Sequence, residues 1–207
     1  MSWKRCPAGK DHQGPMLSIL DIDLDYFNLA KNPTAALKDL LSWAGRPVDF
    51  VVERHSHVLR RWKRRGPAGI GFAPSHILHV DEHHDMMDER PTTNIGNVMY
   101  QAMRTWPSCK VHWLVQRPID SPAMWLTSTT WKSLRRRFSR GPTIPPEWPR
   151  PDIVSVCVSP EFVPSNLTTA LLAVIQTTES GNRKERVPNQ SLHADVEKVP
   201  CRRNRPL

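Results

Sequence analysis

The sequence predicts a single α/β domain of the three-layer α/β/α type, in which helices cover both faces of a mainly parallel sheet. Segments of strand-like composition alternate along the chain with segments of helical periodicity. The strand-like segments are almost continuously apolar, which is typical of parallel strands buried on both faces. The 207 residues suffice for one domain with a substantial core and are few for two.

Short apolar runs predict strands at 17–23, 48–53, 76–81, 110–115 and 152–158. Apolar spacing predicts helices between them, at 34–45, 54–65, 94–106, 121–137 and from Ser165 onward. The first helix has Asn32 as its N-cap, Pro33 as its first residue and Gly45 as its stop. The helix at 121–137 opens in the same way, with Ser121 followed by Pro122, and a proline-rich linker then leads to the last strand.

The predicted domain covers residues 16–178, between an N-terminal extension at 1–15 and a basic tail at 179–207. The tail is rich in Pro, Asn and Arg, so we expect it to be disordered. Residues 181–207 hold seven Lys or Arg against three Asp or Glu, which is +4 of the formal net charge of +9. Two further basic clusters, RRWKRR at 60–65 and RRRFSR at 135–140, fall at predicted helix ends, where cations complement the helix dipole. This distribution does not favour nucleic acid as a main partner.

Other features of the sequence bear on location. No apolar run reaches the ~18 residues that a membrane helix needs. Asp21 and Asp23 interrupt the N-terminal apolar stretch, which argues against a signal peptide. The four cysteines lie far apart without a CxxC pair, so neither a zinc knuckle nor a disulfide scaffold is indicated. We therefore expect no membrane association and a reducing, cytoplasmic location.

Acids and histidines gather at the carboxyl ends of three predicted strands, the edge of a parallel sheet at which ligands bind. They are Asp21, Asp23 and Asp25 after the first strand, Glu53 and His55 after the second, and Asp81, His83 and Asp85 after the third. The side-chain period of a strand places the members of the first and third groups on one side each. The three groups are thus expected to meet in one crevice.

Carboxylates that converge on one crevice repel each other unless cations neutralise them. Oxygen ligands joined by one or two imidazoles suit Mn²⁺ or a similar first-row ion and differ from the cysteine-rich ligand set of many zinc sites. Two ions that share bridging carboxylates would satisfy all of these groups and lower the pKa of a shared water. The residues therefore indicate a pair of first-row divalent ions such as Mn²⁺.

The D-x-D-x-D run also matches two unrelated motifs, each of which accounts for less of the sequence. An EF-hand needs Gly at the sixth and Glu at the twelfth loop position, where this chain has Tyr26 and Asn32. The segment ILDIDLD also resembles the first motif of haloacid-dehalogenase phosphatases. That family has Thr or Val where Asp25 stands, and it leaves the cluster DEHHD without a role.

Taken together, the motifs resemble the arginase/deacetylase (ureohydrolase) superfamily, and within it a small branch that includes the peptide arginases. VDEHHD is similar to the D-x-H-x-D metal motif of the superfamily, which implies Asp81, His83 and Asp85 as ligands. DID resembles its second D-x-D motif, which implies Asp21 and Asp23, with Asp25 as an alternative in a shifted register.

Two further segments extend the resemblance. VVERHSHVL is similar to the segment that supplies the first histidine ligand, which implies His55. TTNIGN resembles the stretch that carries substrate-contacting residues, which implies Asn94 and Asn97. The likeness covers roughly residues 16–175.

The chain departs from the arginase pattern in three ways. The second D-x-D motif precedes the other motif instead of following it, which implies a permuted motif order in the fold. Met99 stands near the place of the proton-shuttle histidine, which leaves His84 or solvent for that role. The carboxylate that docks the guanidinium has no certain counterpart, because Cys157 stands near the matching position and Glu161 is the nearest acid.

The resemblance implies a manganese-dependent hydrolase of guanidino C–N bonds that converts arginine in a peptide substrate to ornithine plus urea. In it, Asp85 would bridge the metals and carry a proton, and Glu161 would pair with the guanidinium. One alternative is a deacetylase or amidohydrolase that acts on a small amide at the same metal site. Another is a non-catalytic basic adaptor that binds nucleic acid or peptides. The remaining histidines are expected to be structural, namely His57, His76, His79 and His112.

Overall fold

The computed structural model describes residues 17–65, 73–117 and 120–184, and it confirms the three-layer α/β/α class. The strands are β1 (Leu17–Asp23), β2 (Phe50–Val52), β3 (Pro74–Val80), β4 (Lys110–Leu114), β5 (Phe138–Gly141) and β6 (Ile153–Cys157). They form one six-stranded sheet in the order β2-β6-β1-β3-β4-β5, and every neighbouring pair is parallel. β1 and β3 lie side by side near the middle, so the two acidic motifs follow adjacent strands.

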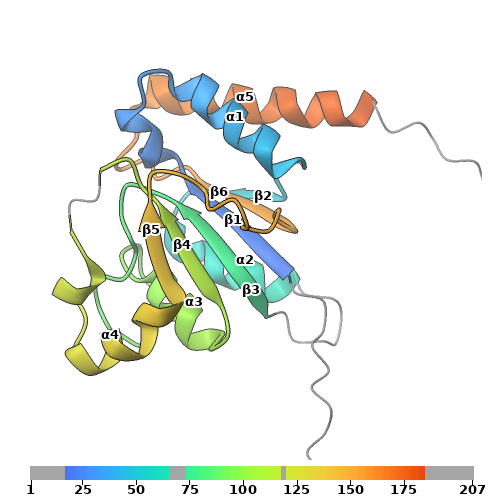
Figure 1. The fold of residues 1–207 in the computed structure, drawn as a ribbon. Coiled ribbons are helices and arrows are strands. Elements are labelled where there is room, and N and C mark those ends of the chain that lie inside the picture. The colour runs from blue at the N-terminus through green and yellow to red at the C-terminus, as the bar shows by residue number, and fades with distance from the viewer. Residues whose placement is uncertain (1–16, 66–72, 118–119, 185–207) are drawn as a thin grey trace, which may run out of the picture.

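Helices cover the two faces of the sheet (Figure 1). α1 (Pro33–Ala44) and α5 (Ser165–Lys184) pack together on one face, and α2 (Val58–Arg65), α3 (Val98–Thr105) and α4 (Ser128–Leu134) lie on the other. Side chains of β1 alternate between the two cores, since Ile19 joins the core under α2 and α3 and Leu20 joins the core under α1 and α5. None of the described helices combines the length and apolarity needed to cross a membrane.

The capping prediction for the first helix is confirmed. The Asn32 side chain accepts a hydrogen bond from the Ala35 backbone N–H at 3.2 Å, and Pro33 is the first helical residue. Gly45 follows the helix at φ 68°, a left-handed conformation that glycine adopts without steric cost.

The prediction of one helix at 121–137 is wrong. The segment divides into a 3₁₀ turn at Pro122–Met124, α4, which is capped by Thr127, and a second 3₁₀ turn at Arg135–Arg137. The unexpected strand β5 follows immediately and pairs with β4 at the edge of the sheet. At the end of the segment, the Arg137 guanidinium donates to the carbonyl oxygens of Met103, Trp106 and Cys109.

Other boundaries differ by a few residues. The helix predicted at 94–106 begins at Val98, and the one predicted at 54–65 begins as a 3₁₀ turn at His55–His57 before α2. α5 runs to Lys184, beyond the domain boundary predicted at residue 178. The N-terminal extension at 1–15 and residues 185–207 of the predicted tail lie outside the described residues.

Candidate metal centre

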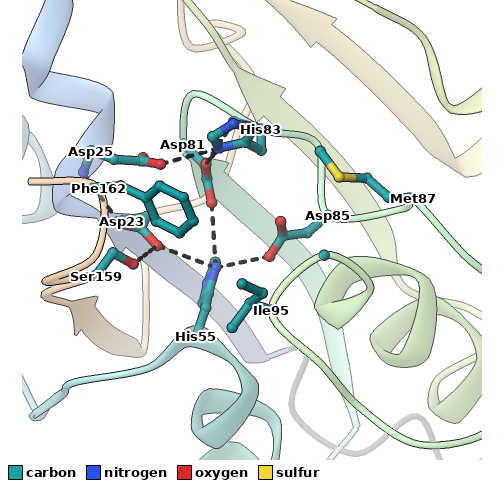
Figure 2. Close-up of a pocket in the computed structure, with 11 residues that line it drawn as sticks. Asp23, Asp25, His55, Asp81, His83, Asp85, Met87, Ile95, Ser159 and Phe162 are labelled. Atoms are coloured by element: carbon teal, nitrogen blue, oxygen red, sulfur yellow. Dashed lines mark hydrogen bonds and ion pairs between the residues drawn. The ribbon is translucent and has the colours of Figure 1, made fainter.

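The predicted convergence of acids and histidines occurs in one pocket at the carboxyl ends of β1 and β3 (Figure 2). The 3₁₀ turn before α2 adds His55, and the segment after β6 adds Ser159 and Phe162. The pocket is lined by Asp23, Asp25, His55, Asp81, His83, Asp85, Met87, Ile95, Gly96, Ser159 and Phe162. Its six Asp and His residues are all among the predicted metal ligands.

Three carboxylates surround one nitrogen of His55. Its Nδ1 lies 2.8 Å from Asp85 Oδ2, 3.3 Å from Asp81 Oδ2 and 3.5 Å from Asp23 Oδ2. Ligands about 2.1 Å from an octahedrally coordinated ion lie about 3 Å from one another. His55 Nδ1 and the Asp23 and Asp81 oxygens lie close enough to one another to hold a single divalent ion, and Asp85 Oδ2 adjoins this group at His55.

A second group of ligands lies on the other side of Asp81. His83 Nδ1 is 3.1 Å from Asp25 Oδ2 and 3.6 Å from Asp81 Oδ1. Asp81 thus directs Oδ2 towards His55 and Oδ1 towards His83, which is the arrangement that a bridging carboxylate requires. Both groups, Asp23–His55–Asp81 and Asp25–Asp81–His83, have ligand atoms close enough to hold a metal ion.

The electrostatics of the pocket favour bound cations. Burial and the neighbouring Asp81 raise the pKa of Asp85 to about 6, against the opposing influence of His55. Burial and the charge of Asp81 also raise the pKa values of Asp23 and Asp25. Carboxyl groups that resist ionisation when metal-free are the groups that a divalent cation would stabilise most.

The histidines respond in the opposite direction. Burial lowers the pKa of His55, but the charges of Asp21 and Asp85 outweigh it and raise the pKa well above its ordinary value. Hydrogen bonds to Asp25 and Asp81 raise the pKa of His83 to about 11. In the metal-free protein, protons on these imidazoles therefore balance part of the negative charge of the carboxylates.

One atom tests directly whether the residues fit a metal. Asp85 Oδ2 is buried, and the described residues offer it no well-aligned hydrogen-bond donor, since its close neighbour is the ring nitrogen His55 Nδ1 at 2.8 Å. A buried carboxylate oxygen without a donor is costly unless a cation contacts it. The donor set of carboxylates and imidazoles is also the set that manganese and similar ions accept. The buried groups are thus compatible with a metal site.

Backbone strain is concentrated at the same place. Among the described non-glycine residues, only Asp85 and Ser159 have positive φ angles, of 50° and 46°. The Asp85 carbonyl is held by the backbone N–H groups of Met99 and Tyr100 in α3, at 3.0 and 3.1 Å. The Ser159 hydroxyl donates to Asp23 Oδ2 at 2.5 Å. Strained residues that are held in place by their surroundings are typical of functional sites.

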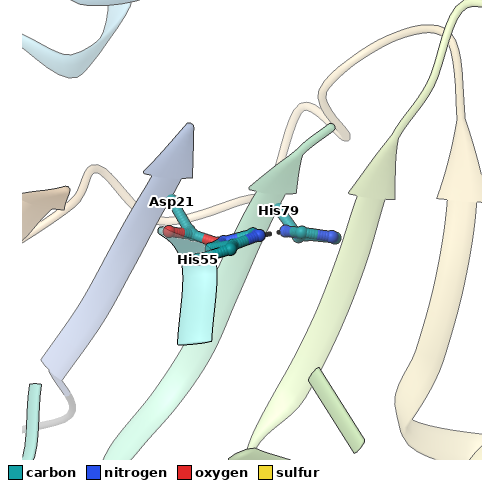
Figure 3. A group of neighbouring side chains, drawn as sticks. All are labelled: Asp21, His55 and His79. Atoms are coloured by element: carbon teal, nitrogen blue, oxygen red, sulfur yellow. Dashed lines mark hydrogen bonds and ion pairs between the residues drawn. The ribbon is translucent and has the colours of Figure 1, made fainter. Parts of the chain in front are cut away.

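The structure separates the three aspartates of the first motif. Asp23 and Asp25 line the pocket, whereas Asp21 is fully buried behind His55 (Figure 3). Burial raises the pKa of Asp21, but His55 and His79 outweigh it and bring the pKa to about 2. Asp21 is thus an anionic hydrogen-bond acceptor, and Asp23 with Asp25 is the pair that faces the pocket.

His79, which the sequence predicts as a purely structural histidine, lies in the cluster. Its Nδ1 is 3.1 Å from Asp21 Oδ2, and its Nε2 is 3.0 Å from the carbonyl oxygen of His83. The signal that could have found it is its position two residues before Asp81, on the same side of β3. His76 and His112 do lie away from the pocket, on the side of β3 and β4 that Trp148 covers.

His84, predicted as a proton shuttle, does not line the pocket. Its ring packs edge-on against Trp113, and its Nε2 is 3.3 Å from Asp120 Oδ1. Burial lowers the pKa of His84 to about 4, against the opposing charge of Asp120. This position does not support proton transfer in the pocket.

Glu161 lies near the pocket but is not part of its lining. Its carboxylate is 48% exposed and pairs with Arg54 at 3.4 Å. It directly precedes Phe162, whose side chain does reach the pocket. Glu161 is therefore placed close to the mouth, with its carboxylate in solvent.

Asn94 and Asn97 hold a loop and do not line the pocket. Asn94 donates to Asp88 Oδ2 at 3.0 Å, and Asn97 donates to Asp88 Oδ1 at 2.8 Å. This loop carries Ile95 and Gly96, which do contact the pocket. The two asparagines therefore shape one wall of the pocket from outside it.

The mouth of the pocket is apolar, a feature that the sequence does not predict. Ile95 and Phe162 are 49% and 50% exposed, and Met87 also belongs to the lining. The Phe162 ring centroid is 6.0 Å from that of His83. No sequence pattern marks these residues, because they come from two loops that meet only in the fold.

Comparisons with family models, curated proteins and solved structures found no match to this chain.

Proposed function

We propose that this protein is a binuclear metal-dependent hydrolase of guanidino C–N bonds that uses manganese and converts arginine in a peptide to ornithine plus urea. The observation that carries the proposal is the meeting of His55, His83 and four aspartates in one pocket. Their spacing forms two overlapping ligand groups that share Asp81. The resemblance of the motifs to the arginase/deacetylase superfamily supplies the reaction class.

The residues of the pocket have separate tasks in this proposal. His55, Asp23, Asp81 and Asp85 would hold one ion, and His83, Asp25 and Asp81 the other. When bound, the pair of ions would supply a water of lowered pKa and positive charge to stabilise the leaving group. Ser159, which donates to Asp23, keeps that carboxylate turned towards the pocket.

Proton transfer is assigned to Asp85. Asp85 lines the pocket, and its Oδ2 faces His55 Nδ1 at 2.8 Å. With Oδ2 on the side of the proposed ion, the second carboxylate oxygen of Asp85 would take a proton from the attacking water and pass it to the departing amine. His84 has no part in this step, because it lies outside the pocket.

A guanidinium substrate needs an anionic partner near the mouth, since it stays protonated in water. Glu161 can provide it by exchanging Arg54 for the substrate. Both side chains of the pair are exposed, at 62% for Arg54 and 48% for Glu161, so their ion pair is worth little and is easily replaced. The apolar side chains of Met87, Ile95 and Phe162 would contact the methylene stem of the substrate arginine.

A second candidate, hydrolysis of a small amide at the same metals, is favoured by a specific feature of the mouth. Among the lining residues of the pocket, the only charged groups are those that face the proposed ions, and the outer wall is apolar. A neutral acyl group fits such a wall without a docking carboxylate.

The test combines metal analysis with product analysis of the purified protein. We expect two manganese ions per chain and, from arginine-containing peptides, release of urea with a mass loss of about 42 Da. Release of acetate from an acetyl-lysine peptide without urea would support the amide hydrolase instead. Protein that binds no divalent ion at all would refute both and leave a non-catalytic adaptor.

A further inference from the structure

A carboxylate behind the pocket is shared by two histidines. Asp21 Oδ2 lies 2.7 Å from His55 Nε2 and 3.1 Å from His79 Nδ1 (Figure 3). The other oxygen of Asp21 accepts a hydrogen bond from the Ser155 hydroxyl at 3.0 Å. Asp21, His79 and Ser155 have no exposed surface, and none of them lines the pocket.

The sheet itself sets up this contact. Asp21 of β1 is in register with His79 of β3 on one side and with Ser155 of β6 on the other. The three residues therefore form one row across neighbouring strands, beneath the strand ends that carry the proposed metal ligands. We propose that Asp21 and His79 are positioning residues of the metal centre, which aim its ligands from behind without binding an ion themselves.

The first part of this role concerns the ring of His55. Because Nε2 of His55 is held by Asp21, its Nδ1 is the nitrogen that faces Asp23, Asp81 and Asp85. Metal-binding histidines commonly donate their second ring N–H to a carboxylate, which fixes the tautomer and the orientation of the ring. Asp21 would accept that hydrogen bond from His55, which would itself bind the ion.

The second part concerns the turn that follows β3. Nε2 of His79 contacts the carbonyl oxygen of His83 at 3.0 Å, in the middle of the turn that supplies Asp81, His83 and Asp85. Asp85 adopts a positive φ angle in this turn, so its backbone needs support. His79 thus connects the end of β3 to all three ligands of the turn, and through Asp21 to His55.

Two groups that contain His79 also lie close enough to hold an ion, namely Asp21–His55–His79 and His79–Asp81–Asp85. In the second group, His79 Nε2 is nearer to the His83 carbonyl oxygen, at 3.0 Å, than to Asp81 Oδ2, at 3.5 Å. Hydrogen bonding accounts for the distances in the first group without an ion, since both imidazole contacts to Asp21 are within normal hydrogen-bond range. The positioning role therefore predicts two ions per chain and not three.

The test is a Mn²⁺ titration of the full chain, followed by electron paramagnetic resonance of the loaded protein. The inference rests on the proposed metal centre, so the wild type should bind two ions with an exchange-coupled spectrum. Asp21→Asn should bind one of them about 10- to 100-fold more weakly, as expected for loss of an outer contact to a ligand. Its spectrum at low manganese should become that of isolated ions.

Variants of His79 test its two contacts, to Asp21 and to the carbonyl oxygen of His83. His79→Leu removes both and should weaken both ions, whereas His79→Gln restores a donor near the Nε2 position and should recover part of the binding. The matched control is His112→Asn, because His112 is a buried histidine with contacts at both ring nitrogens, to Ser139 and Thr143, away from the pocket. It should lower thermal stability without changing manganese affinity or the spectrum.

The outcomes separate this inference from the proposed function. If the wild type binds two ions and Asp21→Asn and His79→Leu bind them equally tightly with the same spectrum, the positioning role is wrong and the metal centre stands. A third ion that is lost in Asp21→Asn also overturns it. If the wild type binds no ion, both proposals are refuted. Should Asp21→Asn fail to fold, Ser155→Ala should weaken the same ion to a smaller degree.

Discussion

Replacement of Asp85 by Asn should stabilise the metal-free protein while it destroys the metal site. Asp85 is buried, and its pKa is about 6 in the folded chain against an ordinary value of 3.8. Because a tenfold change in an acid constant is worth about 1.4 kcal/mol, ionised Asp85 destabilises the fold by about 3 kcal/mol. Asparagine keeps the shape of the side chain and removes the charge.

The pH dependence of this effect has a definite sign. A carboxyl group whose pKa is raised in the fold binds more protons there than in the unfolded chain, so its contribution to stability falls as pH rises from 3.8 to about 6. The advantage of Asp85→Asn should therefore be complete above about pH 6 and vanish towards pH 4. For a chain of this size, about 3 kcal/mol corresponds to an increase in Tm of roughly 6–12 °C.

The assay is thermal or urea unfolding of the chelator-treated wild type and variant at pH 5 and pH 8. Asp39→Asn, which changes an exposed carboxylate on α1, serves as the control and should leave the Tm nearly unchanged. With manganese added at 1,000-fold above Kd, the order should reverse, since the wild type then gains about 4.1 kcal/mol, which exceeds the advantage of the variant. If the Asp85→Asn variant is less stable than the metal-free wild type at pH 8, ionised Asp85 does not destabilise the fold and the reasoning is wrong.

Three further predictions concern the same pocket. Asp81→Ala and His83→Ala should each abolish tight manganese binding and urea release together, and full activity in either would refute the ligand assignment. Manganese affinity should increase with pH between about 5 and 8, because a bound ion displaces protons from His83 and Asp85. The pKa of His83 is about 11 and that of Asp85 is about 6. Calorimetry in two buffers of different ionisation enthalpy measures the number of protons released. Phe162→Ala should raise KM for the peptide several-fold at unchanged manganese content, because its half-exposed ring lines the mouth and contacts no proposed ion directly. An altered manganese content would instead show that the Phe162 ring helps to hold His83 in position.

The sequence by itself determined the fold class and most of its elements. Continuous apolar runs and the Asn32, Pro33 and Gly45 signals act over a few residues, so they are readable without a partner segment. The carboxyl ends of parallel strands meet at one edge of a sheet, which is why Asp23, His55 and Asp81 could be expected in one crevice.

Only the tertiary structure decided which acids reach the pocket. Asp21, Asp23 and Asp25 share a side of the chain, so periodicity cannot rank them. The difference is depth below the edge of the sheet, since Asp21 lies level with His79 and Ser155 and is covered by His55. Local sequence patterns also fail to predict β5, because its pairing depends on β4. They fail to predict the apolar mouth for a similar reason, because it forms where two distant loops meet. Local patterns specify what a segment can form, whereas the neighbours that it acquires on folding specify what its side chains face.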